Sequence, residues 1–338
     1  MFDVAALERW LAAHVAGYRG PLQVERFAGG QSNPTYRLTA ASGRYVLRKK
    51  PEGVLLPSAH AVDREYRVMT ALRDTPLPVP RSFGYCDDVS VIGTPFFVMD
   101  CVEGRIFWDP ALPELSRDER AALWDDINRV VAELHRVDVD AVGLTDFGRP
   151  GNYFERQIAR WTRQYRASES ETIEAMDRLI EWLPAHVPPG DETTIVHGDL
   201  RLDNMIVHPT EPRVVALLDW ELSTLGHPLA DFAYHVMTWR LSATQFRGMA
   251  GKDLAALGIP GEAAYVAAYC ARSGRATIGP STWEFCLAFS MFRLAAILQG
   301  IARRAEEGTA SSAEAVETGR KARPIAELAW ATACKVID

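Results

Sequence analysis

Residues 194–220 constrain the fold of this chain more than any other segment. Short apolar runs alternate there with polar loops, and the loops carry Asp199, Asn204 and Asp219. Apolar runs of this length between turn residues are typical of short buried strands. The segment therefore predicts a tight group of strands whose loops present two carboxylates and one amide.

The order of these three side chains is the order that phosphoryl transfer needs. In that chemistry one carboxylate orients the acceptor hydroxyl, while an amide and a second carboxylate hold magnesium against the phosphates. The spacing from His197 through Asp199 to Asn204 also matches the kinase catalytic loop, written His-Arg-Asp-x-x-x-x-Asn. One such match is only moderately specific, so the rest of the chain has to supply the other parts of the site.

The first part of the chain has the pattern of a small antiparallel sheet. Alternating apolar residues, interrupted by glycine, serine and proline, predict strands over 22–27, 35–39, 44–48, 82–85 and 95–99. The second and third strands are expected to form a hairpin. A helix with Val62, Tyr66, Met69 and Leu72 on one face is expected to follow them.

Beyond about Gly104 the pattern becomes helical. Ser116 and Glu119 form a capping box that opens a helix, and most of the last third of the chain is also helical. These features predict an α+β fold of two lobes. The expected boundaries are 1–102 for a nucleotide-binding lobe and 103–338 for a catalytic and substrate-binding lobe.

Other residues suited to binding a nucleotide occur in a consistent order. Backbone N–H groups able to wrap phosphate oxygens belong to the turn after the first strand, at Gly29, Gly30, Gln31, Ser32 and Asn33. Arg48 and Lys50 stand at the end of the third strand, and Glu65 lies on the helix that follows. The sequence thus places a cation and a carboxylate partner beside the expected phosphates.

Together these motifs resemble the aminoglycoside phosphotransferase (APH) family, which has the protein-kinase-like fold. The resemblance covers roughly residues 20–240, and HGDLRLDN followed by LLDWE is its most specific part. The strings VLRKK, REYRVM and LDWELSTLGHPLADFAY further resemble the branch found beside acyl-CoA dehydrogenases, including their fused N-terminal kinase domains.

The resemblance implies a role for each matching residue. Asp199 is the catalytic base, and Asn204 and Asp219 are the magnesium ligands. Glu65 is the partner of the cation that grips the phosphates. The cofactors implied are ATP, with GTP not excluded, and Mg²⁺.

Three further positions receive supporting roles from the same resemblance. The main chain around Asp100 and Val102 is the adenine-binding hinge. Asp231 begins the helix after the metal loop and has a supporting, non-chemical role. We interpret His197, two residues before the catalytic acid, as a structural brace.

Two departures from the family pattern matter. The position of the phosphate-gripping lysine aligns best with Arg48, while Lys50 points to the same side of a strand because side chains alternate with a period of two. The sequence leaves open which of the two grips the phosphates. Trp220 and Glu221 replace the Phe-Gly of protein kinases, as is usual in the small-molecule branch.

Composition argues against several other classes. The 338 residues carry a net charge of −7, which disfavours general binding to nucleic acid or to an anionic membrane. The five cysteines form no Cys-x-x-Cys pair, which favours reduced thiols in a cytoplasmic protein. The apolar run at 283–301 contains Glu284, Arg293 and Gln299, so we interpret it as a core helix and not as a membrane span. Protein partners are not predicted.

Alternative functions stay open at this point. A nucleotide-binding pseudokinase is favoured only by Arg48, and an aminoglycoside, antibiotic or sugar kinase shares the fold. A protein kinase is disfavoured because Gly226 and Pro228 follow Asp219 too closely for a peptide-binding activation segment. A small-molecule hydroxyl acceptor is expected.

The branch resemblance favours a hydroxyacyl-CoA or a related lipid-derived metabolite as the acceptor. Residues 265–304 combine large aromatic side chains with five arginines, at 272, 275, 293, 303 and 304, against the single acid Glu284. Apolar walls with arginines suit an acyl chain that carries anionic groups. The alternative is that these aromatic residues are core and the arginines are solvated.

Overall fold

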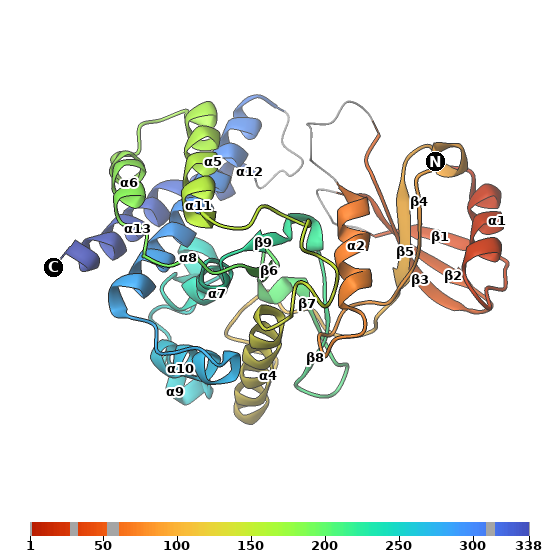
Figure 1. Cartoon of the computed structure of the whole chain (residues 1–338), viewed down its shortest axis with the longest axis horizontal. Coiled ribbons are helices and arrows are strands. Elements are labelled where there is room, and N and C mark those ends of the chain that lie inside the picture. Colours follow the sequence, from red (N-terminus) through yellow and green to blue (C-terminus); the bar gives the residue numbers. More distant parts are fainter. Residues whose placement is uncertain (1, 28–32, 53–60, 309–314, 338) are drawn as a thin grey trace.

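The computed structural model describes residues 2–27, 33–52, 61–308 and 315–337. Figure 1 shows a sheet-rich lobe, which contains the N-terminus, beside a larger helical lobe that contains the C-terminus. This arrangement confirms the predicted α+β, two-lobed fold. The exact boundary between the lobes stays a prediction.

The sheet of the N-terminal lobe has five antiparallel strands in the order β1-β2-β3-β5-β4. Their bounds are β1 Gln23–Arg26, β2 Thr35–Ala40, β3 Gly43–Lys49, β4 Ser82–Cys86 and β5 Phe96–Asp100. Thr35 pairs with Arg48 and Ala40 with Gly43, which confirms the predicted hairpin.

The two faces of this sheet bury different sets of side chains. Helix α1 (Val4–His14) covers the outer face, where Leu47 and Phe96 are buried, and α3 (Val89–Ile92) packs against α1. Helix α2 (Val62–Leu72) lies on the inner face, between the sheet and the helical lobe (Figure 1). Because side chains alternate along a strand, Arg48 projects from β3 toward the same inner face as Val46.

The C-terminal lobe is mainly helical. Its longer helices are α4 Arg117–His135, α5 Tyr153–Ser168, α6 Glu174–Ala185, α7 Pro228–Val236, α10 Glu262–Ser273, α11 Pro280–Glu306 and α13 Ala322–Ile337. Short helices are α8 Ala243–Phe246, α9 Leu254–Leu257 and α12 Ala315–Gly319, with 3₁₀ turns η1 Leu202–Asn204, η2 Trp220–Leu222 and η3 Met237–Trp239. The predicted capping box is present at the start of α4, where Ser116 and Glu119 satisfy each other's main-chain N–H groups.

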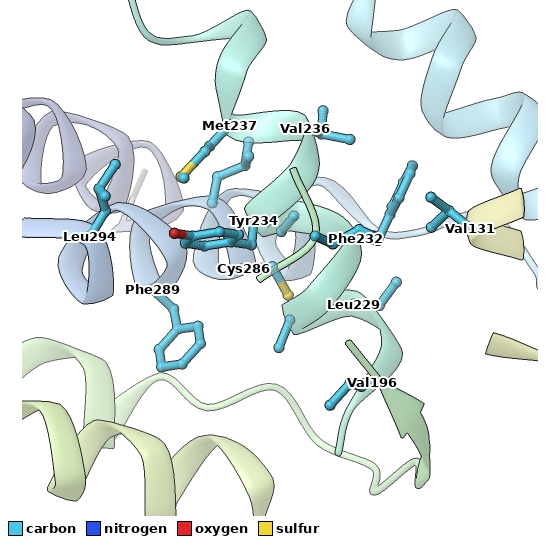
Figure 2. Packing of buried hydrophobic residues seen from close by; sticks show 14 of the residues in the cluster. Val131, Val196, Leu229, Phe232, Tyr234, Val236, Met237, Cys286, Phe289 and Leu294 are labelled. Atoms are coloured by element: carbon cyan, nitrogen blue, oxygen red, sulfur yellow. The ribbon is translucent and has the colours of Figure 1, made fainter. Parts of the chain in front are cut away.

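Helix α11 forms the centre of this lobe. It packs against α5, α7 and α13, and Figure 2 shows Cys286, Phe289 and Leu294 on it beside the side chains of α7. Within the described residues it is the one helix long and apolar enough to cross a membrane, yet 78% of its most apolar window is buried inside the protein. This burial accounts for its apolar sequence, as the core-helix interpretation predicted.

Two small antiparallel sheets lie where the lobes meet. Strand β6 (Thr194–Val196) pairs with β9 (Thr224–Gly226), and β7 (Met205–Val207) pairs with β8 (Val214–Leu217). These are the short buried strands that the segment 194–220 predicted. The loops after β6 and β8 carry the predicted functional side chains.

Candidate active site

The loop after β6 holds Asp199 and folds back on itself through Asn204. The amide nitrogen of Asn204 donates to the main-chain oxygen of Asp199 at 2.8 Å and to its carboxylate Oδ2 at 3.1 Å. The same carboxylate oxygen accepts from Arg201 Nη2 at 2.9 Å. The predicted base and one predicted metal ligand are therefore in direct contact.

Glycine is required immediately before Asp199. Gly198 has a φ of +84°, and a Cβ atom there would collide with the main-chain oxygen of Leu222 in η2. A larger residue would strain the turn and push apart the loops after β6 and β8. This close approach packs the catalytic loop against the loop of Asp219.

Asp231, on α7, holds the catalytic loop in place through hydrogen bonds to its main chain. Its buried carboxylate accepts from the main-chain N–H of His197 at 2.7 Å and of Gly198 at 2.9 Å, and it contacts His135 Nε2 at 3.3 Å. Burial opposes ionisation, but the contacts with His135 and His197 outweigh it and hold the pKa of Asp231 below its usual range. Asp231 positions the loop, as the supporting role predicted.

His197 is fully buried, and its Nδ1 accepts from the main-chain N–H of Asp199 at 3.3 Å. Its Nε2 shares a hydrogen bond with the main-chain oxygen of Leu218 at 2.8 Å, and its ring packs on Trp220. The imidazole thus ties the catalytic loop to the loop after β8. This geometry is that of a structural brace.

Asp219 follows β8 in an unusual backbone conformation. Its φ of +66° and ψ of +57° are left-handed, which is costly for a residue other than glycine and is typical of functional sites. The main-chain N–H of Leu218 donates to the Asn204 oxygen at 2.8 Å, so the two predicted metal-binding loops adjoin each other.

The fit to Mg²⁺ follows from the chemistry of this pair. Magnesium is usually held by one or two carboxylates together with substrate phosphates, so it needs no complete protein cage. Accordingly, the described residues contain no group of three His, Cys, Asp or Glu side chains arranged for a metal. Asp219 supplies a carboxylate, and the amide oxygen of Asn204 is the atom by which that side chain binds a cation.

Arg48 lies among three carboxylates at the interface of the lobes. Its guanidinium is 3.0 Å from Glu65, 2.5 Å from Asp219 and 3.4 Å from Glu221. Burial opposes the charge of Arg48, but these acids hold its pKa above the usual range. The ion pair predicted for Glu65 is present, and its cation is Arg48.

Glu65 is buried to 1% exposure and has an altered pKa. Burial raises the pKa of Glu65 to about 8, and the nearby carboxylates of Asp219 and Glu221 add to the rise that Arg48 opposes. Arg48 thus contacts three acids. Arg48, Glu65, Asp219 and Glu221 are here called the interlobe cluster, in which three carboxyl groups lie around one guanidinium.

The remaining nucleotide-site predictions have mixed outcomes. Gly29, Gly30, Gln31 and Ser32 lie outside the described residues. Asn33 donates through Nδ2 to Glu221 at 3.2 Å, which links the residues just before β2 to the loop that follows Asp219. Lys50 follows the end of β3, where its main-chain N–H bonds to Pro95.

The predicted adenine hinge lies at the end of β5. Asp100 is its last residue, and its main-chain N–H donates to Arg81 at 2.9 Å. Val102 is half-buried in the connection to the helical lobe. The role of both residues in binding adenine stays a prediction.

Comparison with known proteins identifies the family. The model of a phosphotransferase enzyme family, APH, matches residues 23–285. The chain belongs to the APH phosphotransferase family. A Ralstonia eutropha protein assigned to the aminoglycoside phosphotransferases is 55% identical, and the two structures superpose with a TM-score of 0.92 over 99% of each chain.

Relatives of the APH chain also occur within longer proteins. Acyl-CoA dehydrogenase family member 10 of Mus musculus is 47% identical over 98% of this chain, and member 11 of Rattus norvegicus is 42% identical over 96%. The chain spans only 31% and 42% of the lengths of these two proteins. The predicted branch of the family is thereby confirmed.

More distant APH structures share the fold. A spectinomycin phosphotransferase in complex with ADP and spectinomycin superposes with a TM-score of 0.65 at 12% identity, covering 98% of each chain. A phosphotransferase in complex with ADP and hygromycin B superposes with a TM-score of 0.61 at 12% identity, covering 96% of this chain and 98% of the other. At this level of identity they support the kinase-like fold alone.

A pocket in the helical lobe of this APH enzyme opens beside Asp199. Leu200, Arg201 and Tyr234 are among its lining residues, and Arg201 is in contact with Asp199. Burial raises the pKa of the Tyr234 hydroxyl to about 12, and the adjacent Asp199 carboxylate adds to this rise. Figure 2 shows Tyr234 on α7 among the core residues. The sequence analysis missed Tyr234 because no motif links it to Asp199.

The acceptor wall predicted from residues 265–304 is wrong. The aromatic residues assigned to it are core: Tyr265, Tyr269, Trp283, Phe289 and Phe292 are all buried. Arg272 pairs with Asp125, Arg275 with Glu192, and Arg303 with Glu307. Arg272 and Arg275 thus have counter-ions from other parts of the chain, and Arg303 has one at the end of its own helix.

Arg293 is the exception within that segment. It is buried, donates to the main-chain oxygen of Gly198, and lies over the Tyr234 ring with its guanidinium carbon 4.6 Å from the centroid. Through these contacts it supports the turn before Asp199.

Proposed function

We propose that this chain transfers the γ-phosphate of ATP to a hydroxyl group of a small molecule. The observation that carries the proposal is the direct contact of Asp199 with Asn204, in a loop that adjoins the loop of Asp219. These are the side chains that phosphoryl transfer uses, in the order in which it uses them.

In this proposal Asp199 orients the acceptor. Its carboxylate accepts the proton of the acceptor hydroxyl as the hydroxyl oxygen forms a bond to the γ-phosphorus. The bond from that phosphorus to the bridging oxygen breaks, and ADP leaves with the electron pair. Arg201 and Asn204 already bind Asp199 Oδ2, so the carboxylate is held in place before the acceptor arrives.

Asp219 and Asn204 are the residues suited to hold Mg²⁺. The ion would neutralise charge that develops on the phosphate oxygens. Arg48 adds a second positive charge on the N-terminal side, and Glu65 fixes its guanidinium. The ADP bound in the spectinomycin and hygromycin B enzymes supports an adenine nucleotide here, and GTP is a comparison for the assay.

The acceptor we propose is a hydroxyacyl-CoA or a related lipid-derived hydroxy acid. The support is the kinship over almost the whole chain with acyl-CoA dehydrogenase family members 10 and 11. We also propose a cytoplasmic location, because all five cysteines are free thiols.

An aminoglycoside is a weaker candidate. A polycationic acceptor needs carboxylates that are free to bind it. Asp199 and Asp203, the acids beside the pocket, both pair with arginines instead. The pseudokinase alternative loses its support because Arg48 makes the ion pair with Glu65 that a lysine would make.

The test is an ATP-dependent assay with purified chain. Hydroxyacyl-CoAs, free hydroxy acids and kanamycin are each incubated with Mg-ATP, and products are measured by mass spectrometry together with ADP release. Phosphorylation of a hydroxyacyl compound with negligible turnover of kanamycin is expected. Efficient kanamycin phosphorylation without turnover of any hydroxyacyl compound would overturn the acceptor proposal.

A further inference from the structure

Side chains of alternating charge contact one another in succession, from Asp199 to residues that line the pocket. Asp199 contacts Arg201 at 2.9 Å, Arg201 lies 3.6 Å from Asp203, and Asp203 binds Arg247 at 2.7 Å. Asp203, Arg201 and Arg247 all line the pocket beside Asp199. These contacts therefore connect Asp199, through Arg201 and Asp203 of the pocket lining, to a second cation in that lining.

Arg247 has an unusual local structure. It follows α8 with a φ of +37° and a ψ of +51°, a left-handed conformation that is rare for arginine. Its guanidinium lies over the ring of Trp108, 4.4 Å from the centroid. The conformation thus directs the side chain across the pocket to an element more than a hundred residues earlier in the chain.

Trp108 is a large apolar side chain left in solvent. Its exposure is 59%, and it lines the same pocket as Arg247, whose side chain is 39% exposed. Exposed apolar surface beside a cation in a pocket is typical of a ligand-binding surface. Neither residue belongs to the motifs for phosphoryl transfer.

We propose that Arg247 binds an anionic group of the acceptor and Trp108 contacts its acyl chain, while Asp199 binds its hydroxyl. The inference rests on the proposed function, because it assigns the substrate class of that same site. The ligand is a hydroxylated acyl compound whose chain packs on Trp108 and whose carboxylate or phosphate pairs with Arg247.

Charge within the pocket favours an anion over a cation. Arginine binds carboxylate and phosphate through a planar fork of donors. Asp203 already has Arg201 as a second partner, so it keeps a counter-ion when Arg247 turns to the ligand. A cationic ligand would instead meet Arg201 and Arg247 along the same wall.

The anion has two possible sources, which substrates can separate. A free hydroxy acid offers its own carboxylate, whereas a CoA thioester offers the phosphates of the CoA. A neutral N-acetylcysteamine thioester of the same hydroxy acid offers neither. The three acceptors are compared in wild type, Arg247→Gln, Arg247→Lys, Trp108→Ala and Asp203→Asn.

We expect Arg247→Gln to raise KM for the anionic acceptor by roughly tenfold. The kcat of Arg247→Gln and its KM for ATP should stay within about twofold to threefold of the wild-type values. The KM for the neutral thioester should not change, and Arg247→Lys should restore part of the loss. Asp203→Asn should lower the KM for the anionic acceptor, because the Asp203 carboxylate competes with that anion for Arg247. The control is Arg303→Gln, which removes an exposed arginine that also pairs with a nearby acid.

A binding measurement separates this inference from the proposed function. Calorimetry with a saturated acyl-CoA and a saturated fatty acid, which carry no hydroxyl, reports the anion contact without transfer. Weaker binding in Arg247→Gln without any turnover would support the inference and contradict the function. Equal KM and equal binding in folded wild type and Arg247→Gln would overturn the inference, as would equal effects on the neutral thioester.

Discussion

The catalytic loop around Asp199 and the interlobe cluster around Arg48 meet in one site, but their charges are balanced differently. At the catalytic loop, Asp231 of α7 accepts from the main-chain N–H groups of the loop and contacts His135, and Asp199 of the loop accepts from Asn204 and Arg201. In the interlobe cluster one guanidinium faces Glu65, Asp219 and Glu221.

This difference indicates which half of the site is complete by itself. The catalytic loop has its carboxylates hydrogen-bonded without any ligand, so it is preorganised for the acceptor. The interlobe cluster brings three carboxyl groups together, and Asp219 and Glu221 raise the pKa of Glu65, so a cation at Asp219 would relieve repulsion between these acids. Substitutions in the two halves should therefore give different signatures.

The largest effect is expected from Asp199→Asn. The amide cannot accept the hydroxyl proton, so turnover should fall by roughly 10²- to 10⁴-fold. Nucleotide binding should stay nearly intact, because Asp199 acts on the acceptor. Calorimetric titration with Mg-ATP and the mass-spectrometric assay measure the two quantities. Turnover within tenfold of wild type would contradict the assignment, and Asp140→Asn, at an exposed turn, is the control.

Asp219→Ala should change the nucleotide side instead. Removal of the carboxylate should weaken Mg-ATP binding by roughly 10²-fold, since a charged contact with the ion is lost. Asn204→Ala should have a smaller effect because the amide has no formal charge. Thermal unfolding with ATP, in the presence and absence of Mg²⁺, measures this. Undiminished stabilisation of Asp219→Ala by Mg-ATP would show that the metal role is wrong.

Asp231→Asn should break the support of the catalytic loop. The amide leaves one of the N–H groups of His197 and Gly198 without an acceptor. Loss of a buried hydrogen bond to a carboxylate lowers the free energy of unfolding by about 3 kcal/mol. We expect a lower melting temperature and a lower kcat with an unchanged KM for ATP. Asp177→Asn is the control, because its partner Arg166 lies at the surface. An unchanged kcat would contradict the positioning role.

Local signals explain why much of the fold was predictable. The hairpin of β2 and β3 follows from alternation and a short glycine loop, and the start of α4 follows from Ser116 and Glu119. The spacing of Asp199 and Asn204 is equally local. Each of these structures is specified within a few neighbouring residues.

Contacts between distant segments account for what was missed. Counting acids between residues 265 and 304 could not find Asp125 and Glu192, which neutralise Arg272 and Arg275 from other parts of the chain. The sequence likewise does not predict the pairing of Arg247 with Asp203, because the two residues are far apart in the chain.

Which of Arg48 and Lys50 pairs with Glu65 could be decided only from the three-dimensional structure, and which of them grips the phosphates stays a prediction. A period of two places both side chains on one side of the strand, so alternation cannot separate them. The structure does so because β3 ends at Lys49 and α2 presents Glu65 to Arg48.

The smallest effect is expected from Glu65→Gln, and it concerns pH. The pKa of Glu65 is about 8 in the folded protein, above its ordinary value of 4.5. Between these values the folded state binds more protons than the unfolded state, so stability contributed by Glu65 falls as pH rises. His227 and His235, whose pKa values burial lowers to about 4, act in the opposite sense, and their contribution is lost as pH falls below 6.5.

Between pH 7 and pH 9 the buried thiols of Cys86, Cys270 and Cys286, whose pKa values burial raises, act in the same sense as Glu65, so the difference between wild type and Glu65→Gln is what reports on the interlobe cluster. Over this range the wild-type melting temperature should fall by a few degrees, in line with about 1–2 kcal/mol. Glu65→Gln has no proton to lose at this position, so its melting temperature should fall less. Mg-ATP should also reduce the change of the wild-type melting temperature with pH. A cation at Asp219 would offset the repulsion that adds to the effect of burial on the pKa of Glu65. Identical slopes in wild type and Glu65→Gln would mean that the three carboxylates are already balanced, and the contrast between the two halves of the site would be lost.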